Sequence, residues 1–436
     1  MKKRLLLTVV AMLVMCRLGF AQMDFEKAPI NYGSTQSNDA VAQLMRKIEA
    51  GDVKLEFNPR FGWLPALLKQ LDIHSESQVL VFSKTSLQLH RIGPRQPRAI
   101  YFNDDIYVGY CQNGDVLEIG ATDPELGAVF YTIDQMDAQA QILADRGQCL
   151  TCHATNRTQG VPGYLVRSVY PDINGRPRSG TRSTVTDHTS EFGDRFGGWY
   201  VTGSHGNMRH KGNIIANDRS DPEKIDMELG ANLSDLSEFF NGKPYLSTHS
   251  DIVSLMLLEH QSQMHNLLAR ASMETRCAQH HDEGINEALG RPKGTASEST
   301  ERRMARAAED LVKYLLFVDE VPLTEPVRGN TEYARLFQAR AQQFQQVDSQ
   351  GRSLRDLDLQ TRLFKYPCSY LIYSNAFQKL PAPMHELVRK RLVEILTAKQ
   401  PVAGYERLTN QDRSNILEIL RETLPNLFQE PLESVG

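Results

Sequence analysis

Cys149-Leu150-Thr151-Cys152-His153 lies in the first half of a 436-residue chain and has the pattern C-x-x-C-H. This pattern is the attachment signature of a c-type haem. Two thiols about one helical turn apart can add across the two vinyl groups of one porphyrin. The histidine that follows then places its imidazole under the iron as the proximal ligand. The sequence therefore predicts one covalently attached haem c, with Cys149 and Cys152 as attachment sites and His153 as proximal axial ligand.

The residues around this motif fit the same chemistry. Ile142-Leu143-Ala144 is compatible with a helix that leads toward the motif, and Gly160-Val161-Pro162-Gly163 follows it. A proline carbonyl such as that of Pro162 can accept a hydrogen bond from the proximal imidazole and fix the ring orientation. The alternatives are a chance match and a thioredoxin-like dithiol. The histidine directly after the second cysteine argues against both.

The first 21 residues, MKKRLLLTVVAMLVMCRLGFA, have the features of a secretory signal peptide. Three basic residues come first, an apolar run follows, and small residues at positions 19 and 21 precede a plausible cleavage site. The apolar run is too short to span a bilayer, and no later stretch is long and apolar enough to do so. Lipidation at Cys16 is disfavoured because the preceding Met15 is large. We therefore expect a soluble protein exported to the periplasm, where covalent haem attachment takes place.

The net charge limits the possible binding partners, and the number of cysteines limits the possible disulfides. The chain has 49 basic and 53 acidic residues, and the signal peptide holds four of the basic ones, which leaves a mature net charge of −8. A mildly acidic protein is not expected to bind nucleic acid. Beyond the haem motif the mature chain has Cys111, Cys277 and Cys368. Three thiols allow at most one disulfide, and the sequence leaves the pairing open.

The sequence before the motif changes from helical to strand periodicity. A helical pattern covers 39–70, and residues with a period of two follow it. Asn113-Gly114 is a strong signal for a hairpin turn between two of the strands. The sequence thus predicts a small antiparallel β unit with strands at 79–82, 87–89, 99–102, 106–110, 116–119 and 128–131.

A glycine-rich block at 197–213 follows the motif and supplies candidates for the distal side of the haem. Its glycines would allow close approach to a flat cofactor, and His205, Met208 and His210 could each reach an iron. Loop closure from Met208 to the motif costs little chain entropy. Met208 is therefore the first candidate for the distal axial ligand, and with His153 it would complete the metal coordination.

A predicted helix at 249–275 supplies the second distal candidate. Thr248 or Ser250 could cap it, and His260 and Met264 fall on its apolar face. A histidine or methionine on such a face is more often part of the core than a ligand. Met264 is therefore the runner-up for the distal axial position. Four arginines after the motif could pair with haem propionates or could equally be solvated, namely Arg167, Arg176, Arg178 and Arg182.

The last part of the chain alternates amphipathic patterns with prolines at helix starts. It predicts helices at about 304–318, 331–346, 367–380, 383–398 and 410–422. The fold class is therefore α+β, with a small antiparallel β unit, a haem segment and a mainly helical C-terminal half. After the signal peptide at 1–21, we expect an N-terminal helix plus β-rich domain, a cytochrome c-like haem domain, a linker or loop, and a helical domain, at 22–136, 137–281, 282–303 and 304–436.

Four motifs carry a resemblance to a known family: CLTCH, GGWYVTGSHGNMRHKGN, LEHQSQMHN and LQTRLFKYPCSYLIYS. With the strand-rich YFNDDIYVGY, they resemble a family of exported bacterial proteins described only as cytochrome c domain proteins, over nearly the whole mature chain. The resemblance implies haem binding and, by analogy, electron transfer. It carries over residue by residue only for Cys149, Cys152 and His153.

Three function classes follow from these features. The first is a single-haem c-type cytochrome that carries electrons between periplasmic redox partner proteins. The second is a haem enzyme of peroxidase type, with an open distal site and His205 or His210 as acid or base. The third is a structural haem-binding subunit of a periplasmic complex. The first is the expected function.

Overall fold

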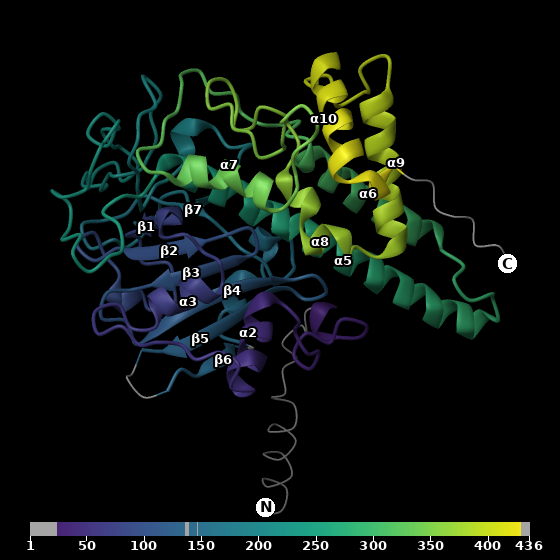
Figure 1. Ribbon diagram of the computed structural model, residues 1–436, viewed down its shortest axis with the longest axis horizontal. Coiled ribbons are helices and arrows are strands. Elements are labelled where there is room, and N and C mark those ends of the chain that lie inside the picture. The colour runs from purple at the N-terminus through teal and green to yellow at the C-terminus, as the bar shows by residue number, and fades with distance from the viewer. Residues whose placement is uncertain (1–23, 136–138, 146, 429–436) are drawn as a thin grey trace, which may run out of the picture.

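Seven strands form one antiparallel sheet, which lies at the lower left in Figure 1, in the order β6-β5-β4-β3-β2-β1-β9. The structure is a computed structural model, and it describes residues 24–135, 139–145 and 147–428. The predicted α+β class is confirmed. The strands are β1 Val79–Val81, β2 Arg98–Phe102, β3 Ile106–Tyr110, β4 Val116–Asp123, β5 Gly127–Asp134, β6 Ile142–Asp145 and β9 Trp199–Tyr200, and a separate ladder pairs β7 Arg167–Ser168 with β8 Thr184–Val185.

Each face of the sheet is covered by helices from a different part of the chain. Asp39, the N-cap of α2 (Ala40–Glu49), accepts a hydrogen bond from the hydroxyl of Tyr131 on β5. On the other face His265 of α5 (Ile252–Leu289) lies 3.0 Å from the hydroxyl of Thr122 on β4. Side chains alternate along strands, so these two contacts mark opposite faces. The predicted hairpin is also present, because Asn113 has φ 54° in the turn between β3 and β4.

One helix prediction and one strand prediction need correction. Ile142-Leu143-Ala144 belongs to the edge strand β6, which pairs with β5, and not to a helix. The predicted strand at 87–89 is instead a loop that leads into a 3₁₀ turn, Leu89–Arg91. The leucines at 87 and 89 are 46% and 51% exposed, so their alternation faces solvent rather than a core. The buried residue between them, Gln88, donates to the carbonyl of Val116 instead.

The sheet draws strands from both sides of position 137. β6 and β9 come from the stretch that was predicted to be a separate haem domain, yet they form the two edges of the sheet. β9 pairs with β1, so Leu80 lies opposite Tyr200. The predicted segments 22–136 and 137–281 therefore share one sheet. The predicted signal peptide lies outside the described residues.

In the second half of the chain, one helix is longer than predicted and another predicted helix is largely absent. α5 begins after its N-cap Asp251, not Thr248 or Ser250, and extends to Leu289. Much of the predicted linker at 282–303 is therefore helical, and only 290–297 join α5 to the next helix. The region predicted as one helix at 367–380 holds only a 3₁₀ turn, Tyr370–Tyr373, and α8. The remaining helices are α3 Leu64–Gln70, α4 Leu150–His153, α6 Glu298–Leu315, α7 Tyr333–Gln343, α8 Asn375–Gln378, α9 Ala382–Thr397 and α10 Asn410–Thr423.

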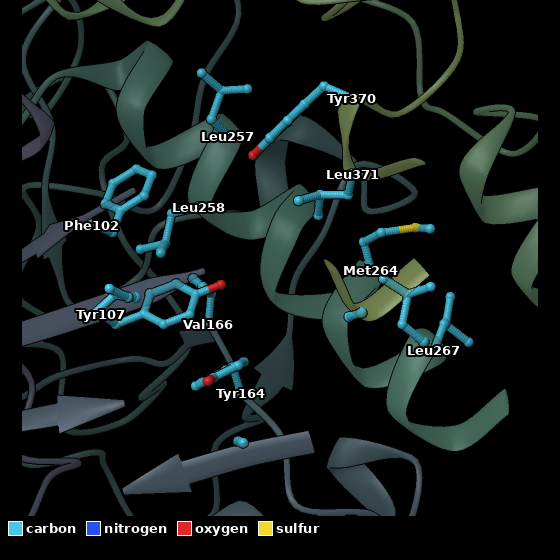
Figure 2. Close-up of a cluster of buried hydrophobic side chains, with 14 of the residues drawn as sticks. Phe102, Tyr107, Tyr164, Val166, Leu257, Leu258, Met264, Leu267, Tyr370 and Leu371 are labelled. Carbon is cyan, nitrogen blue, oxygen red and sulfur yellow. The ribbon is translucent and has the colours of Figure 1, made fainter. Parts of the chain in front are cut away.

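One hydrophobic core joins the sheet to the helices. Figure 2 shows Phe102 and Tyr107 of the sheet, Leu257 and Leu258 of α5, and Leu371 of the C-terminal part converging in this core. All five are less than 9% exposed. Burial of such side chains contributes roughly 1.5–3 kcal/mol each. No helix in the described ranges combines the length and apolarity needed to cross a membrane.

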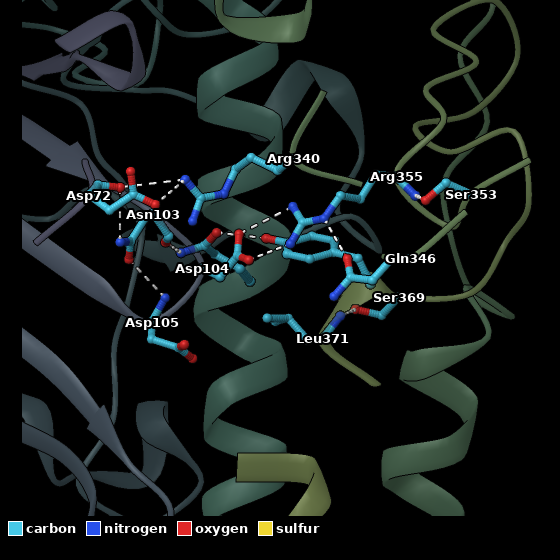
Figure 3. Close-up of polar contacts among 12 residues, drawn as sticks. Asp72, Asn103, Asp104, Asp105, Arg340, Gln346, Ser353, Arg355, Ser369 and Leu371 are labelled. Carbon is cyan, nitrogen blue, oxygen red and sulfur yellow. Dashed lines mark hydrogen bonds and ion pairs between the residues drawn. The ribbon is translucent and has the colours of Figure 1, made fainter. Parts of the chain in front are cut away.

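The turn between β2 and β3 makes a polar contact with the C-terminal part (Figure 3). Asp104 in this turn pairs with the buried Arg355 through both carboxylate oxygens. The adjacent Asp105 has a half-buried carboxylate, and burial, followed by the charge of Asp104, raises its pKa to about 7.

This raised pKa predicts a pH-dependent stability. Below about pH 4 Asp105 is protonated in both states, and between about pH 4 and 7 only the unfolded chain ionises, so stability falls as pH rises. Asp105→Asn removes this loss. We expect the free energy of unfolding of this variant to be about 2 kcal/mol above that of wild type at pH 8. Near pH 4 the two values should be equal. Urea unfolding at both pH values, with the exposed Asp52→Asn as control, measures this. Parallel pH profiles for wild type and Asp105→Asn would contradict it.

Candidate haem attachment site

The predicted attachment residues lie on a single helical turn. Cys149 is the N-cap of α4, and its carbonyl accepts the backbone N–H of His153 at 2.9 Å. Asp145, the last residue of β6, accepts the backbone N–H of Cys149 at 2.7 Å and ties the turn to the sheet. Cys152 is exposed and Cys149 is half-buried. Both thiols and the imidazole thus come from one short helix, as the motif requires.

The ring of His153 is fixed by a hydrogen bond from Nδ1 to the carbonyl of Gly163, at 2.9 Å. The predicted partner Pro162 is therefore corrected by one residue, because the Pro162 carbonyl accepts the backbone N–H of Ala128 at 3.0 Å. Glycine is required at 163, since an added Cβ would lie 2.2 Å from Oδ1 of Asn266. With Nδ1 as donor, Nε2 is the nitrogen left for an iron.

The environment keeps these groups in the protonation states that a haem site needs. Burial lowers the pKa of His153, so its imidazole is neutral near pH 7. The ring also packs against Phe130 of β5, with 4.7 Å between ring centroids. Burial, then the hydrogen bond to Asp145, raises the pKa of the Cys149 thiol. A neutral thiol and a neutral imidazole are therefore present together.

A partly buried ion pair borders the motif on the sheet surface. Nη2 of Arg98 lies 2.6 Å from Oε2 of Glu118, and both charges act on His153 and Cys149. Among the four arginines considered as propionate partners, Arg167 lies close enough for its charge to interact with Cys152. Its Nε is buried and has no hydrogen-bond partner among the described residues. Arg167 and Arg98 are therefore the cations best placed near the motif.

The remaining arginines of that set are engaged elsewhere or exposed. Nε of Arg182 lies 3.2 Å from Oε2 of Glu223. Nη1 of Arg178 donates to the carbonyl of Ala216 at 2.6 Å. Arg176 has an exposed side chain.

No described contact joins Met208 to His153. Met208 follows β9 at one edge of the sheet, whereas His153 follows β6, the strand at the opposite edge. Met208 is 8% exposed, and its carbonyl accepts a hydrogen bond from Nδ1 of His205 at 2.7 Å.

The two histidines beside Met208 serve the local structure of the glycine-rich block. His205 uses both nitrogens, because its Nε2 also accepts the backbone N–H of Asn232 at 3.0 Å. Nδ1 of His210 accepts the backbone N–H of Gly212 at 3.0 Å, and burial lowers its pKa to about 3. These contacts leave His205 without a free nitrogen and His210 as a neutral core residue.

Met264 lies on α5, the helix that also contacts the segment after the motif. Asn266, two residues further on, bonds both backbone groups of Tyr164 at 2.8 Å, next to the Gly163 that holds His153. Met264 itself is fully buried, and Figure 2 shows its side chain pointing away from Tyr164. No described contact therefore places either predicted methionine beside Nε2 of His153.

Sequence reasoning missed a buried histidine pair. Nδ1 of His188 lies 2.9 Å from Nδ1 of His260, which is indeed a core residue on its helix. No spacing in the sequence links these positions, 72 residues apart. The thiols of Cys111, Cys277 and Cys368 are all free in the structure. Within the described residues no group of three or more histidine, cysteine or acidic side chains is arranged to hold a metal ion.

The residues at the motif fit a covalently bound haem by the chemistry of their donors: two thiols, and an imidazole whose Nε2 is free. No family model, no curated protein and no solved structure matches the chain.

Proposed function

We propose that this protein is a single-haem c-type cytochrome that carries electrons between periplasmic redox partners. The observation that carries the proposal is the C-x-x-C-H turn with Nδ1 of His153 held by Gly163 and Nε2 free. When bound, haem c supplies a one-electron iron couple. The chain would contribute the two attachment sites Cys149 and Cys152 and the proximal ligand His153. Export to the periplasm is part of the proposal and rests on the leader at 1–21.

A second candidate function is a haem enzyme of peroxidase type. It is favoured because no described contact joins Met208 or Met264 to His153. An open sixth position favours binding of a small molecule, whereas a filled one favours electron transfer.

Ligand variants test these two functions. Because no described contact joins either methionine to His153, we expect Met208→Ala and Met264→Ala each to keep the wild-type ferric spectrum and reduction potential. A high-spin spectrum and a potential lower by on the order of 0.1 V in one variant alone would assign that methionine as the distal ligand.

Cyanide and peroxide additions to the wild type complete this experiment. A low-spin spectrum that neither reagent changes supports the electron carrier. A high-spin spectrum that shifts with both supports the enzyme. A haem-free product from a host that matures c-type cytochromes would contradict both functions.

A further inference from the structure

A polar cavity lies between α5, α6 and the loop at 187–189, and Gln159 also lines it. This cavity of about 280 Å³ is lined by His188 and Tyr314 together with charged and amide side chains, among them Asp187, Lys313 and Asp319. One buried water needs only roughly 10–15 Å³ of such volume. The cavity is therefore large enough for a small organic molecule.

His188 is the buried end of a hydrogen-bonded chain that reaches this cavity. Its Nδ1 faces Nδ1 of His260 at 2.9 Å, and Nε2 of His260 faces the hydroxyl of Ser369 at 2.8 Å. Tyr314 and Phe317 stack against the His188 ring at 4.1 and 4.3 Å between centroids. His188 is 2% exposed, and the other two members of the chain are fully buried. Nε2 is therefore the polar atom of the His188 ring left for a ligand.

The chain accommodates a set of proton positions in which Nε2 of His188 is a donor. The Ser369 hydroxyl oxygen accepts the backbone N–H of Leu371 and can donate its own proton to Nε2 of His260. In this arrangement the proton of His260 lies on Nδ1 and is donated to Nδ1 of His188. That leaves the proton of His188 on Nε2, which is buried and has no hydrogen-bond partner among the described residues. Such a donor costs about 1–3 kcal/mol unless an acceptor is supplied.

The charges around the cavity indicate what kind of molecule would supply that acceptor. Arg270 and Asp310 pair with each other at 3.2 Å. The remaining charged groups are the cation Lys313 and the carboxylates of Asp187 and Asp319, and Oδ1 of Asp187 already accepts the backbone N–H and the hydroxyl of Thr189. Lys313 and the N–H of His188 favour an anionic or carbonyl oxygen, and the two carboxylates favour a donor on the same molecule.

We propose that the His188 cavity binds a small carboxylic acid that carries an amino or hydroxyl group on the carbon next to the carboxylate. The carboxylate accepts from Nε2 of His188 and from Lys313, and the amino or hydroxyl group donates to Asp187 and Asp319. Burial lowers the pKa of His188 well below its usual value, so the ring acts as a neutral donor. This proposal does not depend on the haem motif and goes beyond electron transfer.

Calorimetric titration of the mature protein with L-alanine, L-lactate and propionate tests the proposal. Alanine offers an ammonium group, lactate a hydroxyl, and propionate neither. We expect saturable binding of alanine, lactate or both, and binding of propionate at least tenfold weaker. Equal binding of all three acids, or no saturable binding of any, would overturn the proposal. Binding of alanine alone would identify the ammonium group as the required donor, and binding of lactate alone would identify the hydroxyl group.

Variants locate the binding on the cavity. His188→Gln should weaken binding at least tenfold, and the more conservative Asp319→Asn, at an exposed position, should weaken it while leaving the fold intact. Glu283→Gln, an exposed acid far along α5, is the matched control and should bind as wild type does. If His188→Gln does not fold, Asp319→Asn decides. Wild-type affinity in Asp319→Asn, or in a folded His188→Gln, would refute this site.

Discussion

Replacement of both Cys149 and Cys152 by alanine should abolish haem that stays on the polypeptide through denaturing electrophoresis. The two thioether bonds are the only covalent links that the motif provides, and both thiols lie on one turn anchored by Asp145. Coordination by His153 alone does not survive denaturation. Haem staining of the periplasmic fraction, normalised to protein, measures the loss, and we expect it to be complete.

Two further variants make this result specific. Cys277→Ala removes a half-buried thiol outside the motif and should keep full haem staining. His153→Ala keeps both thioether sites and should keep some covalent haem, but with a five-coordinate or altered ferric spectrum. Persistent staining in the double cysteine variant, or equal loss in Cys277→Ala, would show that the motif is not the attachment site.

The elements that the sequence predicted well are those whose periodicity matches a buried face. β3 and β4 were recognised because their alternation faces a real core and Asn113-Gly114 forms the turn between them. Position 87–89 shows the opposite case, because two leucines alternate with Gln88 but face solvent. Pattern alone does not reveal which side of a strand has a partner layer.

The motif alone predicts the roles of the two cysteines and the histidine, but it does not predict which residues surround them. The contact of His153 with Gly163 rather than Pro162 depends on Asn266, which is a hundred residues away in sequence and fills the space beside Gly163. The prediction of Met208 as distal ligand rested on short chain separation, yet strand β9 intervenes and pairs at one edge of the sheet. Loop-closure entropy favours nearby residues only when no strand fixes the chain between them.

Arg355 is the residue whose loss should cost the most stability in the C-terminal part. Its side chain is 1% exposed, pairs with Asp104, and lies over the rings of Tyr370 and Phe337 at 4.5 and 5.0 Å. It thereby links the turn between β2 and β3 to the C-terminal part (Figure 3). Removal of one partner of a buried ion pair leaves an uncompensated charge, which is more damaging than loss of the whole pair.

Arg355→Leu should therefore lower the free energy of unfolding by about 3–5 kcal/mol. Urea unfolding at constant pH measures the change, and the exposed Arg335→Leu, which breaks a surface pair with Glu332, should change it by less than about 1 kcal/mol. Adding Asp104→Asn to Arg355→Leu removes the stranded carboxylate and should restore part of the loss. If the double variant is as unstable as the sum of the two single variants, the ion pair does not account for the effect, and the stacking of the guanidinium on Tyr370 does.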